Sequence, residues 1–107
     1  MDLFYAFAEP RRRLIVEMLA RNGQMTATEI SGNFDISPQA VSQHLGVLLQ
    51  ANILRMKKKA QRHIFQLNPA SIRELEEWAK QTERLWDERL DRLDEVLKEE
   101  KKKNAKK

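Results

Sequence analysis

The chain has no cysteine, and its 107 residues include only three glycines and three prolines. Without cysteine it can form no disulfide bond, thiolate metal site or thiol redox sensor. This composition suits the reducing cytoplasm, where we expect the protein to act. The scarcity of glycine and proline favours long, regular helices over a turn-rich β architecture. The N-terminus lacks the basic region of a signal peptide, and no apolar stretch approaches the roughly 20 residues that span a bilayer, so we expect no membrane partner.

Charge is distributed unevenly along the chain. Residues 1–68 hold nine basic and five acidic residues, residues 69–100 hold six and eleven, and residues 101–107 hold five and none. With 41% hydrophobic and 34% charged residues, a chain of this length fits one folded domain with one additional element. Basic charge that is confined to one part of a chain is typical of a protein that binds a polyanion.

The stretch from Ser37 to Asn52 is predicted to be a helix with two different faces. Ser37 can cap its start, Pro38 suits its first position, and apolar residues recur at three- and four-residue spacing. Amide and hydroxyl side chains on the other face could hydrogen-bond base edges in the major groove, although the same pattern fits a polar surface helix. That face is polar but uncharged, and it carries Gln39, Ser42, Gln43, Gly46 and Gln50.

Two helices are predicted nearer the N-terminus. Apolar side chains at residues 3–7 indicate a short helix that ends before Pro10. The second helix is expected over Arg11–Asn22, with Gly23 after it as part of its C-cap. Its buried face is expected to consist of Leu14, Ile15, Met18 and Leu19.

Three arginines, Arg11, Arg12 and Arg13, open the second helix. Cations at the positive end of a helix dipole are unfavourable unless an anion lies nearby. The run is therefore either a solvated helix start or, for one or two of its members, a phosphate contact. We assign the contact to Arg12.

A helix-turn-helix is expected from residue 26 onward. Thr26 and Glu29 have the spacing of a capping box, in which each side chain bonds the backbone N–H of the other residue. They open a short helix with Ile30 and Phe34 on its buried side. Residues 35–37 then form a tight turn into the Ser37–Asn52 helix.

A basic hairpin is expected after Asn52. Apolar residues within 53–56 and 64–67 indicate two short strands around a cluster of cations. The tip lacks the Asn-Gly or Asp-Gly pair of a tight turn, so a longer, mobile loop is expected. The hairpin is either a phosphate-binding wing or a solvated loop that is basic by chance. The residues that we expect to bind DNA phosphates are Arg12, Ser37, Lys57, Lys58, Lys59 and Arg62.

One uninterrupted helix is expected over residues 69–100. At the helical rise per residue it would be about 45 Å long, so its own chain cannot cover its whole apolar stripe. A second copy that pairs through this stripe is the simplest arrangement, and packing within the chain is the alternative. The expected homodimer interface consists of Leu3, Phe4, Leu75, Trp78, Leu85, Trp86, Leu90, Leu93 and Leu97.

These elements predict a mainly α fold with a small two-stranded β wing, which is a winged helix-turn-helix followed by a long C-terminal dimerisation helix. The expected divisions are a DNA-binding domain over residues 1–68, the dimerisation helix over 69–100 and a disordered basic tail over 101–107.

The ordered motifs resemble those of the ArsR (arsenical-resistance repressor) family of winged-helix regulators. Phe7-Ala-Glu-Pro-Arg-Arg-Arg-Leu-Ile-Val-Glu-Met-Leu19 is similar to the family's opening motif, and Ser42, His44 and Leu45 match its S-x-H-L signature. The resemblance covers residues 3–67, and Trp78 and Trp86 further resemble a metal-independent branch with W-x7-W in its last helix. Asn52 and Ala60 stand where the family prefers glycine.

The metal-sensing members of this family carry cysteine pairs before the recognition helix, or Asp and His sets on the last helix. Here residues 28–35 contain neither Cys nor His, and the two histidines are His44 and His63. A zinc site usually needs three or four ligands. We therefore expect no metal and no cofactor, and we interpret His44 as a helix residue beside the core or as a DNA contact.

The resemblance implies a homodimeric, sequence-specific transcriptional repressor that binds an inverted repeat in double-stranded DNA. Base reading is expected from Gln39, Ser42, Gln43 and His44. The alternative is a winged-helix module that binds a protein partner through its long helix and has only non-specific DNA affinity. An enzyme is not expected, because the chain has no nucleophile–base pair, no glycine-rich phosphate loop and no carboxylate pair outside the solvated helix.

Overall fold

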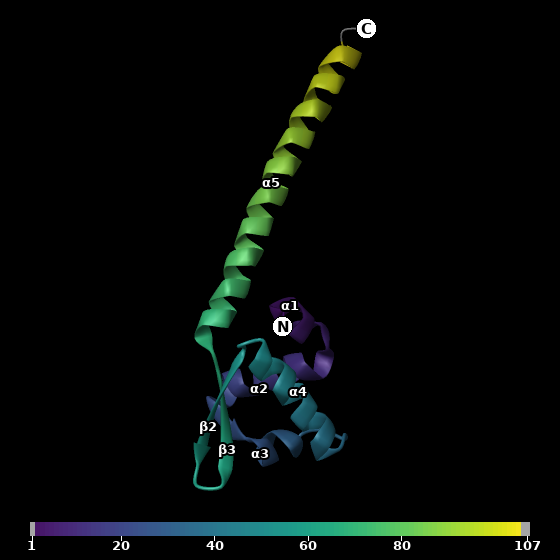
Figure 1. The fold of residues 1–107 in the computed structure, drawn as a ribbon. Helices are drawn as coiled ribbons and strands as arrows, with labels where there is room; N and C mark the ends of the chain where they lie inside the picture. The colour runs from purple at the N-terminus through teal and green to yellow at the C-terminus, as the bar shows by residue number, and fades with distance from the viewer. Residues whose placement is uncertain (1, 106–107) are drawn as a thin grey trace. The chain divides into compact units, whose positions relative to one another are not determined.

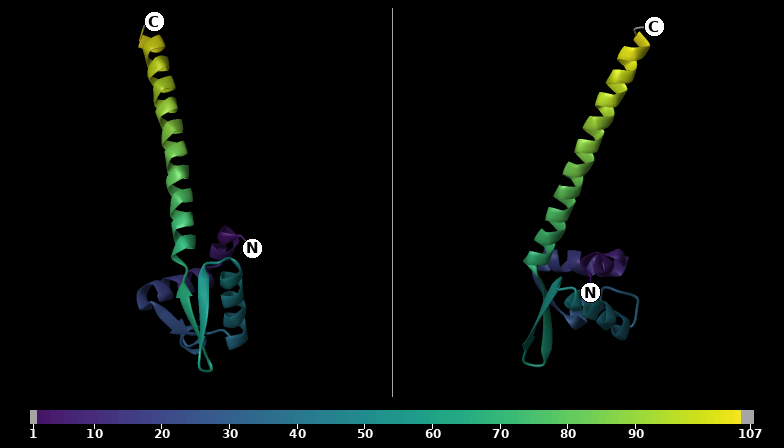
Figure 2. Two further views of the ribbon diagram at one scale, coloured as in Figure 1. Left: turned by 60° about the vertical axis from the view of Figure 1, so that its left-hand side comes forward. Right: turned by 45° about the horizontal axis from the view of Figure 1, so that its top comes forward.

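The computed structural model describes residues 2–105, which divide into two compact units, with the boundary in the sequence between Arg73 and Glu74. The first unit combines four helices with a small sheet, and the helices lie on one side of the hairpin (Figures 1 and 2). The elements are α1 (Leu3–Ala8), α2 (Pro10–Asn22), β1 (Gln24–Thr26), α3 (Ala27–Ser31), α4 (Pro38–Gln50), β2 (Leu54–Lys59), β3 (Arg62–Leu67) and α5 (Pro69–Ala105).

Helix α2 begins and ends close to the predicted residues. The Glu9 carboxylate accepts a hydrogen bond from the Arg12 backbone N–H at 3.1 Å, and Gly23 ends the helix with a φ of 82°. The predicted buried face needs a correction, because Leu14 is 48% exposed while Val16 is buried. Ile15 and Leu19 are buried as expected.

The predicted helix-turn-helix is confirmed in α3 and α4. The capping box is complete, because Glu29 N–H donates to Thr26 Oγ1 at 3.2 Å and Thr26 N–H donates to the Glu29 carboxylate at 3.4 Å. Ser37 caps α4 by accepting the Ala40 N–H at 3.1 Å. Val41, Leu45 and Leu48 of α4 are buried, so the opposite face of this helix is left exposed.

The predicted winged-helix fold is confirmed, with β2 and β3 as the two strands of the wing, but the sheet also has a third strand that was not predicted, in the order β1-β3-β2. β1 is antiparallel to β3 and aligns Met25 with Phe65, which are both buried. Its three residues are too few to show an alternating pattern, and its partner strand begins 36 positions after it ends. The sequence therefore carries no local signal for this strand.

The hairpin turn is tight, so the prediction of a longer, mobile loop is wrong. Lys59 pairs with Arg62, which leaves only Ala60 and Gln61 to connect β2 and β3. Ala60 adopts the left-handed conformation, with a φ of 56°, that glycine usually supplies in such turns. Asn52, which also replaces a glycine of the family pattern, has a φ of 60°.

The core of the first unit joins all four helices to the sheet. Helices α1 and α4 each pack against α2, and α4 also packs against β2. Apolar side chains from α2, α3, α4 and the start of the wing are almost completely removed from water. The largest of them are Ile15, Leu19, Ile30, Val41, Leu48 and Ile53.

Helix α5 runs without a break for 37 residues. At its start, the Ser71 hydroxyl donates to the Asn52 carbonyl, and the Asn68 side chain accepts the Ala70 N–H at 3.3 Å. The helix continues to Ala105, beyond its predicted end at residue 100, and residues 106–107 of the expected disordered tail lie outside the described residues. Lysines in its last turn are favourable at the negative end of the helix dipole.

Within residues 2–105, no helix combines the length and apolar character that crossing a membrane requires.

Candidate nucleic-acid interface

The predicted base-reading residues of α4 fall into two groups. Gln39, Ser42 and Gln43 are exposed within the first two turns of the helix, beside the exposed cap residue Ser37. Because Val41 and Leu45 fix the opposite face in the core, these three side chains are presented to solvent on one surface. We call Gln39, Ser42 and Gln43 the reading face.

His44 belongs to a different surface of α4. Its side chain is only 17% exposed, and its Nδ1 lies 3.4 Å from Nη1 of Arg12 and 3.9 Å from Oε2 of Glu9. At about 100° per residue, His44 is about 140° around the helix from Gln39. This placement argues against the predicted base contact of His44.

Arg12 is also not placed as a phosphate contact. The residue is 8% exposed, its Nε donates to the Ala6 carbonyl at 2.7 Å and its Nη2 donates to the Tyr5 carbonyl at 3.1 Å. Its guanidinium carbon lies 5.3 Å from the centre of the Tyr5 ring. In the sequence Arg12 is one of three similar cations, but in the structure its side chain hydrogen-bonds backbone carbonyls of α1 and stabilises that helix.

The four predicted wing cations are exposed, but the sheet divides them between its two faces. Directly opposed residues of an antiparallel pair share a face. Lys58 is opposite His63, on the same face as buried Phe65, whereas Lys59 is opposite Arg62 on the other face. Lys57 shares the face of Lys59, because side chains alternate along a strand.

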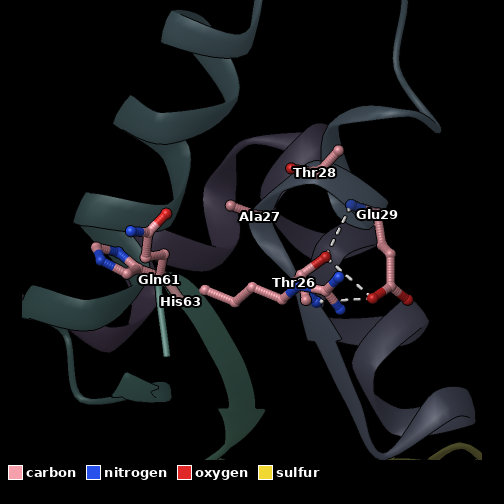
Figure 3. Close-up of a pocket in the computed structure, with 7 residues that line it drawn as sticks. Thr26, Ala27, Thr28, Glu29, Gln61 and His63 are labelled. Carbon is pink, nitrogen blue, oxygen red and sulfur yellow. Dashed lines mark hydrogen bonds between the residues drawn. The ribbon is translucent and has the colours of Figure 1, made fainter. Parts of the chain in front are cut away.

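An open hollow of about 530 Å³ lies between the wing turn and the start of α3. Figure 3 shows Gln61 and His63 of the wing on one side of it and Thr26 and Glu29 on the other. The Glu29 carboxylate also accepts the Thr26 hydroxyl at 3.0 Å, so its Oε1 already takes part in the capping box. We interpret this hollow as the gap between two surface elements.

Glu9 lies where α2 meets the flank of α4. Partial burial acts to raise the pKa of its carboxyl, but the hydrogen bond from the Arg12 backbone N–H and the nearby cation Arg11 outweigh it and lower the pKa. The carboxylate is therefore the stable form at neutral pH, and this form caps α2.

Most of the predicted dimer residues are exposed, and the two exceptions are Leu3 on α1 and Leu75 on α5. Leu85, Trp86, Leu90, Leu93 and Leu97 are between 41% and 61% exposed, and Trp78 is 52% exposed. Phe4 is 41% exposed, whereas Leu3 is 8% exposed and belongs to the core of the first unit. Leu75 is half-buried.

Metal ligands do not gather in the part of the chain that the structure describes. There, no three His, Asp or Glu side chains lie close enough together to hold an ion.

The contact between Arg12 and His44 could not be predicted from the sequence, because it joins residues 32 positions apart. The S-x-H-L signature marks His44 as special but does not show which residue it contacts.

Comparisons with known proteins agree with this arrangement. The profile of the arsR family of bacterial regulatory proteins matches residues 9–55. The transcriptional repressor SdpR of Bacillus subtilis is 34% identical over 77 residues, which are 72% of this chain and 84% of that protein. The crystal structure of an ArsR family transcriptional regulator superposes with a TM-score of 0.73 at 25% identity, over 79% of this chain and 87% of that one. An ArsR-like transcriptional regulator from Rhodococcus has a TM-score of 0.79 at 20% identity, over 89% of this chain and 86% of that one, and this likeness shows the fold alone.

Proposed function

The chain belongs to the ArsR family of bacterial regulatory proteins, and we propose that it acts as a homodimeric repressor of an inverted-repeat operator. As a member of this family it is a DNA-binding transcriptional regulator rather than an enzyme. Each copy inserts the start of α4 into a major groove, and the wing contacts the adjacent phosphates. The similarity to SdpR, a transcriptional repressor, supports repression over activation.

The reading face is the observation that carries this proposal. Its three side chains are exposed, uncharged and rich in hydrogen-bond donors and acceptors, while cations lie on the neighbouring wing. Phosphate contacts by cations supply affinity for any sequence, and amide and hydroxyl groups then discriminate among bases. We assign base reading to Gln39, Ser42 and Gln43 and phosphate binding to Ser37, Lys57, Lys58, Lys59 and Arg62.

The proposed dimer rests on the apolar stripe of α5 and on its charge distribution. An exposed row of leucines and a tryptophan is the kind of surface that a partner helix covers. Residues 74–88 hold six acidic and two basic residues, whereas residues 98–107 hold six lysines and two glutamates. An antiparallel pair of α5 helices places the acidic stretch of each copy beside the basic end of the other.

Selection of bound fragments from a random DNA pool tests the proposed function. We expect enrichment of an inverted repeat whose half-sites lie about 10 base pairs, or a multiple of that, apart from centre to centre. A pool that stays random after several rounds, while another protein co-purifies through α5, would instead favour the protein-interaction module.

Removal of one wing cation should reduce affinity without changing the sequence preference. We expect Lys58→Ala to weaken binding to the selected operator and to random DNA by the same factor. The slope of log K against log salt concentration should become less steep by about one unit, because one phosphate contact is lost. Titrations at several salt concentrations measure both quantities.

Arg92→Ala on α5 is the matched control, because it removes the same charge outside the winged-helix unit and outside the two charged stretches of the proposed dimer. The control should leave the salt slope unchanged. An unchanged slope for Lys58→Ala would remove this lysine from the proposed contact set.

A further inference from the structure

Arg12 joins two helices that are distant in the sequence. Its guanidinium donates to carbonyls of Tyr5 and Ala6 in α1 and lies 3.4 Å from the His44 ring nitrogen in α4. Each of these helices packs against α2, which carries Arg12 itself. The guanidinium therefore provides a polar connection between α1 and the helix that carries the reading face.

The contact between Arg12 and His44 specifies the form of the imidazole. A guanidinium has only donors, so a hydrogen bond between the two groups requires Nδ1 of His44 to accept and the ring proton to lie on Nε2. The Glu9 carboxylate also lies close to the ring, with its Oε2 3.9 Å from the same nitrogen. Arg12 and Glu9 thus compete for one atom of His44, and the shorter contact is with Arg12.

A contact on this flank can control how α4 is rotated about its axis. The apolar residues Val41, Leu45 and Leu48 fix the depth of the helix, but apolar packing has little directional preference. A rotation of about 20° moves a side-chain tip about 6 Å from the axis by about 2 Å. That displacement is large compared with the tolerance of a bidentate hydrogen bond to a base.

We propose that Arg12 is a positioning residue that sets the rotation of α4 through His44, and that this pair, without touching DNA, maintains the alignment of the reading face with the bases. This inference rests on the proposed function, since it concerns specific binding through α4. It replaces two roles expected from the sequence, the phosphate contact of Arg12 and the base contact of His44.

Arg12→Gln and His44→Leu test the proposal on the operator selected with the wild-type protein. We expect each variant to bind that operator about tenfold more weakly, as for the loss of one hydrogen bond to a charged group. Affinity for random DNA and the salt slope should both stay at their wild-type values, because no phosphate contact is removed. The double variant should bind about as well as either single variant, because both changes remove the same contact.

His44→Asn is the matched control, because its side-chain oxygen can accept from Arg12 while the imidazole is absent. This variant should retain most of the specific affinity. As an independent readout, 15N chemical shifts of the His44 ring at alkaline pH should report a proton on Nε2 in the wild type and a mixture of tautomers in Arg12→Gln.

Four outcomes would overturn the proposal. They are a salt slope that falls by about one unit in Arg12→Gln, additive losses in the double variant, an unaffected His44→Leu variant, and a His44→Asn variant as weak as His44→Leu. The two His44 variants decide the matter if Arg12→Gln does not fold. A wild-type protein that enriches no operator would contradict the proposed function itself, and is distinguishable from these results.

Discussion

Replacing Leu90 and Leu93 by glutamate should convert the protein into a monomer and weaken binding to the selected operator by about 10²–10⁴-fold. Both leucines are exposed on α5, and each would place a charge in the apolar contact of the proposed dimer. In a dimer, the second half-site is bound at the high effective concentration that the first provides. A monomer must bind the two half-sites as separate events.

Sedimentation equilibrium measures the dissociation, and DNA titration measures the loss of affinity. The double variant Gln81→Glu with Arg84→Gln is the control, because it changes the net charge by the same amount. Gln81 is about 180° around α5 from Leu90. The proposed interface would be wrong if the leucine variant stayed dimeric, or if both double variants dissociated equally.

Gln43→Ala should reduce affinity for the selected operator by about 5- to 150-fold, which corresponds to about 1–3 kcal/mol for a bidentate contact to a base. Gln43 is exposed on the second turn of α4, and its amide can donate and accept at the same time. Affinity for random DNA should change little, because the side chain is uncharged. A second selection with this variant should show relaxed preference at one position in each half-site.

Gln50→Ala makes the same substitution at the last residue of α4, which also is exposed. The recognition helix of this fold contacts bases through its N-terminal residues, so Gln50→Ala should bind the operator as the wild type does. Equal losses on operator and random DNA for Gln43→Ala would count against base reading by Gln43.

Local patterns in the sequence were sufficient to predict the helix-turn-helix. A capping box at Thr26 and Glu29, a cap at Ser37 and the spacing of Val41, Leu45 and Leu48 each involve neighbours within one helix. Interactions of this range are encoded where they occur, and the structure confirms them. The reading face could be placed for the same reason, because it is the surface opposite to the buried residues.

Contacts between distant segments could not be predicted in this way. β1 exists because β3 pairs with it, and the burial of Arg12 depends on carbonyl groups of α1 and a ring on α4. Leu14 and Val16 are both apolar, and the directions from which α1, α4 and the sheet pack against α2 decide which one is buried. The chemical type of a residue therefore limits the contacts that it can form, and the packing of distant segments determines which of these contacts it forms.

The two-residue turn at Ala60 and Gln61 orders the wing when the protein folds. A mobile basic loop would lose about 1–2 kcal/mol of backbone conformational entropy for each residue that became fixed on DNA. Residues 57–59 and 62 are instead paired across the hairpin by the strand ladder before any partner binds. In the proposed complex, the wing is a pre-organised element, and the attraction of its cations to phosphate is not offset by the entropy of ordering a loop.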